Sequence, residues 1–317
     1  MENQILIEAR QLSRRYGPTV AVDGLDLTLR QGEILGLLGP NGAGKTTTMK
    51  MLAGCLAPSA GSIRINGVDL REDPKAAKGH LGYLPEQPPV YPELTVDEYL
   101  AFCAGLHGIA RAQRAAAVAS AKKDCGLTQA GGRLVGNLSK GYQQRVGLAQ
   151  AIIHRPPVVI LDEPTVGLDP IQIREIRTLI TQLGQSHSVI LSSHILPEIQ
   201  AVCGRVMIIH RGRSVYNEPV VHDALAAAVT VQLRRAPDAG ELLKLPGVAR
   251  VQELGEGRFR LHCAPQADPR EGAAEAAARG NWGLVELRAE QKTLEEIFVE
   301  LTAGDDPRVE APQEKAA

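Results

Sequence analysis

The protein has 317 residues, a formal net charge of −1 and 22% charged residues. The length suffices for one large domain and a small one, and the near-neutral charge gives no basic field for nucleic acid or an anionic bilayer. The first residues lack the pattern of a signal peptide, and no uncharged apolar run approaches the ~18 residues of a membrane-spanning helix.

The first 30 residues predict two antiparallel strands joined by a polar turn. Apolar and polar residues alternate over 5–9 and 24–29, as in strands with one buried face. Tyr16 lies in the turn between them, next to Gly17 and Pro18. Two interpretations remain open here, because its ring either stacks on a purine base or is a half-buried loop tyrosine with a wet hydroxyl.

A glycine-rich loop follows an apolar run at 34–38 and leads into a helix expected from about Lys45. The loop and the helix start are Gly39, Pro40, Asn41, Gly42, Ala43, Gly44, Lys45, Thr46 and Thr47. Both glycine spacing and the Lys-Thr pair fit a P-loop, whose backbone N–H groups and helix N-terminus bind phosphates. Lys45 would reach the outer phosphates, and Thr46 would ligate Mg²⁺.

Two polar residues follow a later strand that is stopped by prolines. The strand begins at Leu81, and Glu86 and Gln87 come after Pro85. They therefore lie in a loop at a strand end, where an open parallel sheet presents its ligand-binding residues. Each either binds a metal or its water, or is a solvated polar residue.

A helical insertion is predicted between sheet strands, over about residues 95–135. A capping-box pattern at 95–98 and an alanine-rich stretch at 111–123 favour helices; the alanines either pack helices together or form a docking surface. Ser139 and Gly141 then precede a helix expected over 146–153. They form either a helix cap or a second anion site.

Acidic residues end the next apolar run. Residues 158–161 are apolar and lead directly into Asp162 and Glu163, which predicts a buried parallel strand ending beside the P-loop. Asp162 would hold Mg²⁺ through water, and Glu163 would act on the water that attacks the phosphate. His194 ends a further buried strand, where it either contacts the γ-phosphate or is a structural histidine.

Beyond about residue 226 the pattern changes to β-α-β-β-α-β, followed by an amphipathic helix at 293–301. This order is typical of a ferredoxin-like split βαβ unit. No catalytic cluster is evident in it, so we expect residues 226–303 to form an accessory or regulatory domain. Residues 304–317 are rich in Pro, Glu and Lys, and we expect them to be disordered.

Together, these motifs resemble the ATP-binding cassette (ABC) family over about residues 3–225. They are the P-loop, Leu138-Ser139-Lys140-Gly141-Tyr142-Gln143-Gln144, Ile160-Leu161-Asp162-Glu163, Gly167-Leu168-Asp169 and His194. The Leu-Ser-x-Gly element beside such an acidic strand end is not shared with other P-loop ATPases. The resemblance implies an α/β P-loop NTPase fold with an antiparallel β subdomain, a helical insertion and a small C-terminal α+β domain.

The resemblance also implies roles for single residues. Tyr16 would stack on adenine, Ser139 and Gly141 would contact ATP across a dimer, Asp169 would belong to the D-loop, and His194 would act as the switch. One position departs from the family pattern, because Glu86 stands where the family has its Q-loop glutamine and Gln87 follows it. A carboxylate is itself a hard oxygen ligand, so Glu86 remains a candidate for the metal.

The implied function is that of the ATP-hydrolysing subunit of a multicomponent transporter. The signature element at 138–144, in particular its residues 140–142, and the 84–86 and 294–298 segments are similar to exporter-type cassettes, including those of gliding-motility and nitrous-oxide-reductase accessory systems. Two cassettes, identical or different, would pair head to tail with ATP and Mg²⁺ between them. The dimer would dock on a separate membrane permease at the cytoplasmic face of the inner membrane, through the insertion and the Glu86 loop, and Glu163 with His194 would hydrolyse ATP.

A soluble cassette ATPase that acts on ribosomes or DNA is the alternative function. Such proteins commonly carry two cassettes or a long coiled-coil insertion. This chain shows one cassette, no long heptad pattern and no basic stripe, which favours the transporter subunit.

Overall fold

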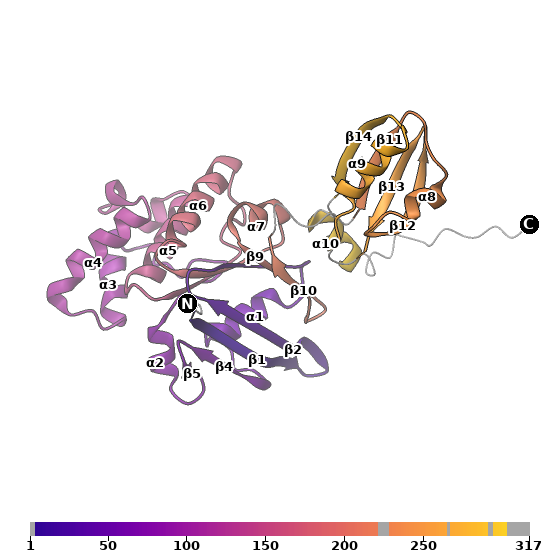
Figure 1. Ribbon diagram of the computed structural model, residues 1–317. Helices are drawn as coiled ribbons and strands as arrows, with labels where there is room; N and C mark the ends of the chain where they lie inside the picture. The colour runs from indigo at the N-terminus through magenta and orange to yellow at the C-terminus, as the bar shows by residue number, and fades with distance from the viewer. Residues whose placement is uncertain (1–3, 221–227, 265–266, 291–293, 303–317) are drawn as a thin grey trace, which may run out of the picture. The chain divides into compact units, whose positions relative to one another are not determined.

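The computed structural model describes residues 4–220, 228–264, 267–290 and 294–302, and the chain divides into two compact units, Met1–Val220 and Val221–Ala317 (Figure 1). The domain boundary expected near residue 226 and the tail expected at 304–317 lie outside the described residues.

An antiparallel sheet opens the first unit. Its strand order is β2-β1-β4-β5, and the strands are β1 (Ile5–Tyr16), β2 (Thr19–Arg30), β4 (Ala60–Ile65) and β5 (Val68–Asp69). The first two strands extend beyond their alternating segments, because backbone pairing continues through the polar residues of the hairpin. The expected turn position of Tyr16 is therefore wrong: it ends β1 and pairs with Thr19.

A six-stranded sheet forms the second layer, in the order β10-β9-β3-β8-β7-β6. The strands from β9 to β6 are parallel, and β10 is an antiparallel edge strand. Every residue of β7 and β8 is buried, as the uninterrupted apolar pattern of β7 predicts. The strands are β3 (Ile34–Leu38), β6 (Leu81–Leu84), β7 (Val158–Asp162), β8 (Ser188–Ser193), β9 (Arg205–His210) and β10 (Arg213–Pro219).

Helix α1 (Lys45–Leu52) contributes to the core that joins the two sheets. Met49, Met51 and Leu52 are fully buried in a cluster with side chains from β1, β2, β3 and β7 to β9. The short helix α2 (Pro74–Gly79) also reaches this core, through Ala77. The predicted P-loop therefore leads directly into a helix of the buried core.

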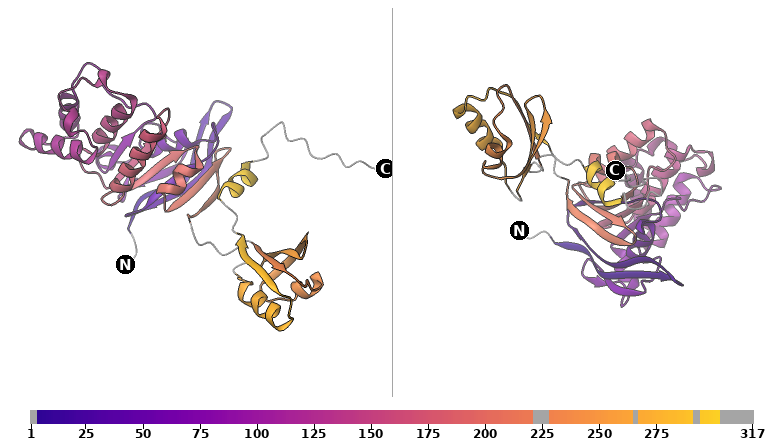
Figure 2. Two further views of the ribbon diagram at one scale, coloured as in Figure 1. Left: turned by 90° about the horizontal axis from the view of Figure 1, so that it is seen from above. Right: turned by 90° about the vertical axis from the view of Figure 1, so that its right-hand side faces the viewer.

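The predicted helical insertion is present. Figures 1 and 2 show its helices, α3 (Val96–Leu106) and α4 (Arg111–Asp124), away from the β1–β2 hairpin. The capping box at Thr95 and Glu98 is confirmed. Short 3-10 turns η1 (Thr128–Ala130) and η2 (Val135–Asn137) lead to α5 (Lys140–Ile152).

The expectation that α5 starts at Val146 is wrong. The helix starts at Lys140, because Ser139 caps it while its first turns lack the apolar spacing that sequence patterns detect. Two further helices follow, α6 (Pro170–Leu183) and α7 (Leu196–Val202), and α7 was not predicted.

The second unit contains a four-stranded antiparallel sheet in the order β12-β13-β11-β14, the order of a ferredoxin-like split βαβ fold. Alternate residues of β11, including Val229 and Val231, pack with Leu242 of α8 and Ala273 of α9. The elements are β11 (Ala228–Leu233), α8 (Ala239–Leu243), β12 (Val248–Gly255), β13 (Arg258–Cys263), α9 (Arg270–Arg279), β14 (Leu284–Glu290) and α10 (Leu294–Thr302). Throughout the described parts of both units, no helix is long and apolar enough to cross a membrane.

Candidate active site

The predicted site residues follow parallel strands that end at the same edge of the six-stranded sheet. Leu38 at the end of β3 pairs with Ser193 of β8, and Asp162 at the end of β7 pairs with Ser192. The carboxyl ends of neighbouring parallel strands are where an open α/β sheet binds its ligands. The register therefore places the P-loop, the acidic pair and His194 side by side.

Two P-loop glycines are required by close backbone contacts. Gly44 has a φ of +107°, and a Cβ on it would lie 2.6 Å from the carbonyl oxygen of Ala21. A Cβ on Gly39 would lie 2.3 Å from the carbonyl oxygen of Ile209. Only glycine fits these positions, so the loop stays compact and its N–H groups remain available to a ligand.

Lys45 is buried at the start of α1 with three acceptors. Its ammonium donates to the carbonyl oxygens of Gly39 at 2.8 Å and Pro40 at 3.2 Å, and its Nζ lies 3.5 Å from Oε1 of Glu163. Its side chain is 6% exposed. A buried cation needs such partners, and a phosphate oxygen would supply a stronger one.

Asp162 has one hydrogen-bonded oxygen and one oxygen without a partner. Its Oδ1 accepts from Ser192 Oγ at 2.7 Å and from Thr46 Oγ1 at 3.4 Å. Its Oδ2 is buried and has no hydrogen-bond donor. Burial raises the pKa of Asp162, the charges of Glu163 and Glu86 raise it further, and the hydrogen bonds oppose this. A cation at Oδ2 would stabilise the carboxylate.

Glu163 adopts a left-handed backbone conformation, with a φ of +49°. Its N–H donates to Ser192 Oγ at 2.9 Å, and its Oε2 lies 2.9 Å from His194 Nδ1. The Glu163 side chain is 8% exposed and that of His194 is 41% exposed. Glu163 is therefore held between a buried cation and a histidine that solvent reaches.

A pocket of about 340 Å³ opens at these residues. It is lined by P-loop residues together with Ala21, Glu86, Glu163, Val166 and His194. Glu86 and Gln87 are both exposed, but only Glu86 lines this pocket. Tyr16 does not line it either: it is 47% exposed, and the guanidinium of Arg14 lies 4.7 Å from its ring centroid.

Ser139, Gly141 and Asp169 line a different hollow of about 540 Å³. Ser139 is exposed at the N-cap of α5, where its hydroxyl accepts weakly from Tyr142 N at 3.4 Å. Asp169 caps α6 by accepting from two backbone N–H groups at 2.9 Å each. Within one chain, the structure does not bring these residues to the P-loop pocket.

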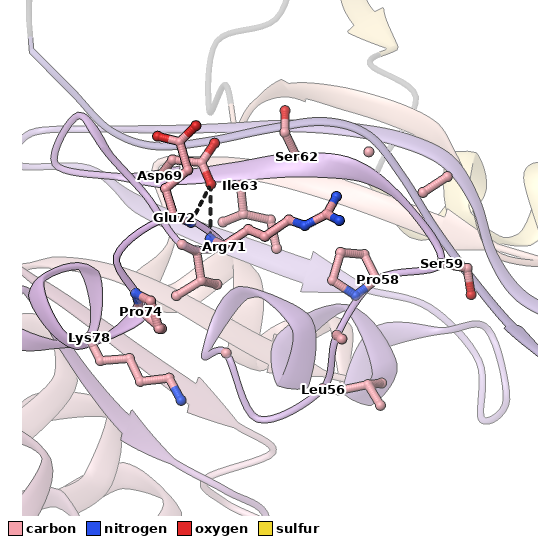
Figure 3. Close-up of a pocket in the computed structure, with 15 residues that line it drawn as sticks. Leu56, Pro58, Ser59, Ser62, Ile63, Asp69, Arg71, Glu72, Pro74 and Lys78 are labelled. Atoms are coloured by element: carbon pink, nitrogen blue, oxygen red, sulfur yellow. Dashed lines mark hydrogen bonds between the residues drawn. The ribbon is translucent and has the colours of Figure 1, made fainter.

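A third pocket, of about 670 Å³, lies beside the antiparallel sheet (Figure 3). It contains none of the predicted site residues. Asp69 there accepts hydrogen bonds from the backbone N–H groups of Arg71 and Glu72, as Figure 3 shows.

Sequence reasoning missed Ser192, which bonds Asp162 and the backbone of Glu163 and so fixes the acidic pair. It also missed Glu198, a buried carboxylate on α7. A signal was present for the first, because two serines end a fully buried strand just before His194.

The sequence of this chain is similar to those of known proteins. A family model described as "ABC transporter" matches residues 22–166. The bacitracin transport ATP-binding protein BcrA of Bacillus licheniformis is 40% identical over 219 residues, which cover 68% of this chain and 71% of that protein. The chain belongs to the ABC transporter family.

Further members of the family extend the match. The Nod factor export ATP-binding protein I of Burkholderia orbicola is 32% identical over 305 residues, which cover 94% of this chain and 97% of that protein. The solved structure of cbiO1 from Clostridium perfringens, part of the ABC transporter complex cbiONQ, aligns with a TM-score of 0.63 and 26% identity, over 69% of this chain and 90% of that one.

The family membership confirms the predicted ABC cassette fold, ATP binding and ATP hydrolysis. The gliding-motility and nitrous-oxide accessory subtype stays a prediction, because these relatives' names do not distinguish it.

Proposed function

We propose that this ABC ATPase powers a membrane exporter, and that two cassettes build each ATP site between them. One observation carries the dimer: a single chain holds the P-loop pocket and the Ser139–Gly141 hollow as separate surfaces. A partner cassette in head-to-tail orientation would bring its exposed Ser139 and the N-terminus of its α5 against the phosphates held at Lys45. Asp169 would then lie in this interface, and the exposed Tyr16 would stack on the adenine.

The acidic pair suits Mg²⁺ with ATP. Among the described residues no group of three or more His, Cys, Asp or Glu side chains gathers to hold a metal. Mg²⁺ in nucleotide sites uses one or two carboxylates together with phosphates and water. The unpartnered Oδ2 of Asp162, the Thr46 hydroxyl and the Glu86 carboxylate fit that need. When bound, Mg²⁺ neutralises phosphate charge during transfer.

Glu163 and His194 are the proposed catalytic residues. Phosphoryl transfer requires an aligned water and little further covalent assistance. The Glu163 carboxylate lines the pocket with limited exposure, which suits a group that orients this water and accepts its proton. His194 contacts Glu163 through Nδ1 and also lines the pocket, so its exposed ring would be available to the γ-phosphate of bound ATP.

A membrane permease is the proposed partner, at the cytoplasmic face of the inner membrane. Exposed aromatic rings lie on the segment after the Glu86 loop and on the helical insertion: Tyr91 is 46% and Phe102 of α3 is 45% exposed, with their ring centroids 5.8 Å apart. Exposed aromatic clusters are typical of protein interfaces. The names of BcrA and of the Nod factor protein support transport, and the latter supports export.

The test is to tag Glu163→Gln, express it in the native cell, and identify by mass spectrometry what remains bound in the membrane fraction with ATP. We expect a multi-spanning protein to co-purify, and to be lost on Tyr91→Ala/Phe102→Ala. A protein that stays unbound, or brings ribosomes or DNA, would contradict the transporter assignment in favour of a soluble cassette ATPase.

A further inference from the structure

Glu198 is a buried carboxylate that contacts neither the P-loop nor the pocket. It lies in the first turn of α7 and is 3% exposed. Its Oε2 accepts from Thr165 Oγ1 at 2.6 Å and from Ser193 Oγ at 3.0 Å. Its Oε1 has no hydrogen-bond partner and lies 3.9 Å from the Arg177 guanidinium. Burying a carboxylate lowers the free energy of unfolding unless hydrogen bonds and a nearby cation offset the loss of hydration. A carboxylate kept at this cost, with one oxygen bonded to two hydroxyls, is a candidate for a role in the site.

The two donors come from the segments that carry the proposed catalytic pair. Thr165 follows Glu163 in a tight loop, in which the Val166 N–H bonds the Glu163 carbonyl at 3.2 Å. Ser193 immediately precedes His194. Glu198 therefore ties the loop of one catalytic residue to the strand end of the other.

We infer that Glu198 is a positioning residue that fixes the Glu163–His194 pair for ATP hydrolysis. The inference rests on the proposed roles of that pair. Glu163 needs such support, because its φ of +49° is unfavourable for a side chain with a Cβ. Ser192 holds the backbone of Glu163 from one side. The clamp formed by Glu198 with Thr165 and Ser193 holds the loop that follows. Loss of the clamp would let His194 and Glu163 separate, while the P-loop keeps its own contacts.

The test measures ATP turnover and ATP affinity of Glu198→Ala. We expect kcat to fall about tenfold, because two hydrogen bonds to a charged group are lost, with the Kd for ATP within about twofold measured in the Glu163→Gln background. Glu198→Gln keeps an acceptor for the hydroxyls and should recover much of kcat. Unchanged kcat in Glu198→Ala, or equal losses of kcat and affinity, would overturn the inference.

Single-donor variants cover the case in which Glu198→Ala fails to fold. Thr165→Val and Ser193→Ala each remove one of the two bonds to Glu198 and should lower kcat less; Ser193→Ala also removes the bond that Ser193 Oγ accepts from Ile195 N at 3.0 Å. Ser188→Ala is the matched control, because Ser188 is also buried on β8 but bonds Gly32 N at 2.8 Å at the far end of the strand. Equal kcat in Ser193→Ala and Ser188→Ala would count against the clamp.

A double-mutant cycle separates positioning from general stability. If Glu198 acts through His194, Glu198→Ala should cost less than about twofold in kcat once His194 is already alanine. A full tenfold loss in that background would overturn the inference. The underlying roles are tested separately: if Glu163→Gln and His194→Ala keep normal turnover, the proposed catalytic pair fails, whatever Glu198→Ala does.

Discussion

The P-loop pocket and the hollow lined by Ser139, Gly141 and Asp169 differ in how complete they are within one chain. At the pocket, buried Lys45 pairs with Glu163 at 3.5 Å. The neighbouring Asp162 accepts from Ser192 at 2.7 Å and from Thr46 at 3.4 Å, while its Oδ2 has no hydrogen-bond donor. In the hollow, Ser139 is exposed and makes one long hydrogen bond, while the ion pair of Arg145 and Glu175 at 2.7 Å borders it.

This difference has a structural origin. The pocket is built by strand ends of one parallel sheet, so its geometry is set by the core. The hollow lies at the N-termini of α5 and α6; the carboxylate of Asp169 already caps α6, whereas the start of α5 has only the weak Ser139 cap and would gain from an anion. We infer that the first surface is preorganised for nucleotide and that the second is completed by the nucleotide of another cassette.

Glu163→Gln should show the largest effect and act on the pocket alone. We expect kcat to fall roughly 10²- to 10⁴-fold, because the group that accepts the proton of the attacking water is lost, while ATP still binds. A turnover assay measures kcat and a nucleotide titration measures ATP affinity, with the exposed Glu72→Gln as control. Brisk hydrolysis by the variant would remove Glu163 from this role.

Lys45→Ala should remove ATP binding from the pocket without altering the hollow. It deletes the cation that faces the phosphates and leaves Glu163 buried without its partner, so we expect ATP affinity to fall roughly 100-fold or more. Lys50→Ala, on the exposed side of the same helix, is the matched control. Unchanged affinity in a nucleotide titration would contradict the phosphate role of Lys45.

Tyr16→Ala should have a smaller effect that depends on the base. Loss of stacking is worth about tenfold in ATP affinity, whereas the affinity for inorganic triphosphate should not change. Tyr16→Phe keeps the ring and should behave as the wild type. Equal losses for both ligands would show that Tyr16 does not stack on adenine.

The contact between the end of α5 and the six-stranded sheet should make the free energy of unfolding depend on pH. His154 follows α5 and stacks on His107 with ring centroids 3.7 Å apart; its Nε2 lies 3.2 Å from the carbonyl oxygen of Leu81 and its buried Nδ1 has no hydrogen-bond partner. Burial, with the nearby His107, lowers the pKa of His154 to about 4.

Because the pKa of His154 is lower in the folded state than the ordinary 6.5, the unfolded chain binds its proton first as the pH falls. The free energy of unfolding should therefore decline between pH 6.5 and about 4. A shift of this size corresponds to about 3 kcal/mol, which solvent screening of the partly exposed ring reduces to on the order of 1–2 kcal/mol. Denaturant unfolding of the wild type and of His154→Leu checks this. Identical pH profiles would contradict the assignment.

The contrast between the two surfaces also shows what sequence could predict. The P-loop, Asp162 and Glu163 were predictable because each lies at the end of a short buried strand, and a motif in that context fixes both position and chemistry. The start of α5 was not, because a capped first turn carries no apolar periodicity. Glu198 was not predictable either, since its donors, Thr165 and Ser193, come from distant segments that only the sheet topology brings together.

The most direct test of the composite site mixes two inactive variants, Lys45→Ala and Ser139→Glu, and measures ATP hydrolysis. In a mixed dimer, one site combines both defects and the other has an intact P-loop opposite an intact signature. We predict that equal amounts recover about a quarter of wild-type turnover if sites act independently, since half the dimers are mixed and each has one intact site. A mixture as inactive as its two components would contradict the account.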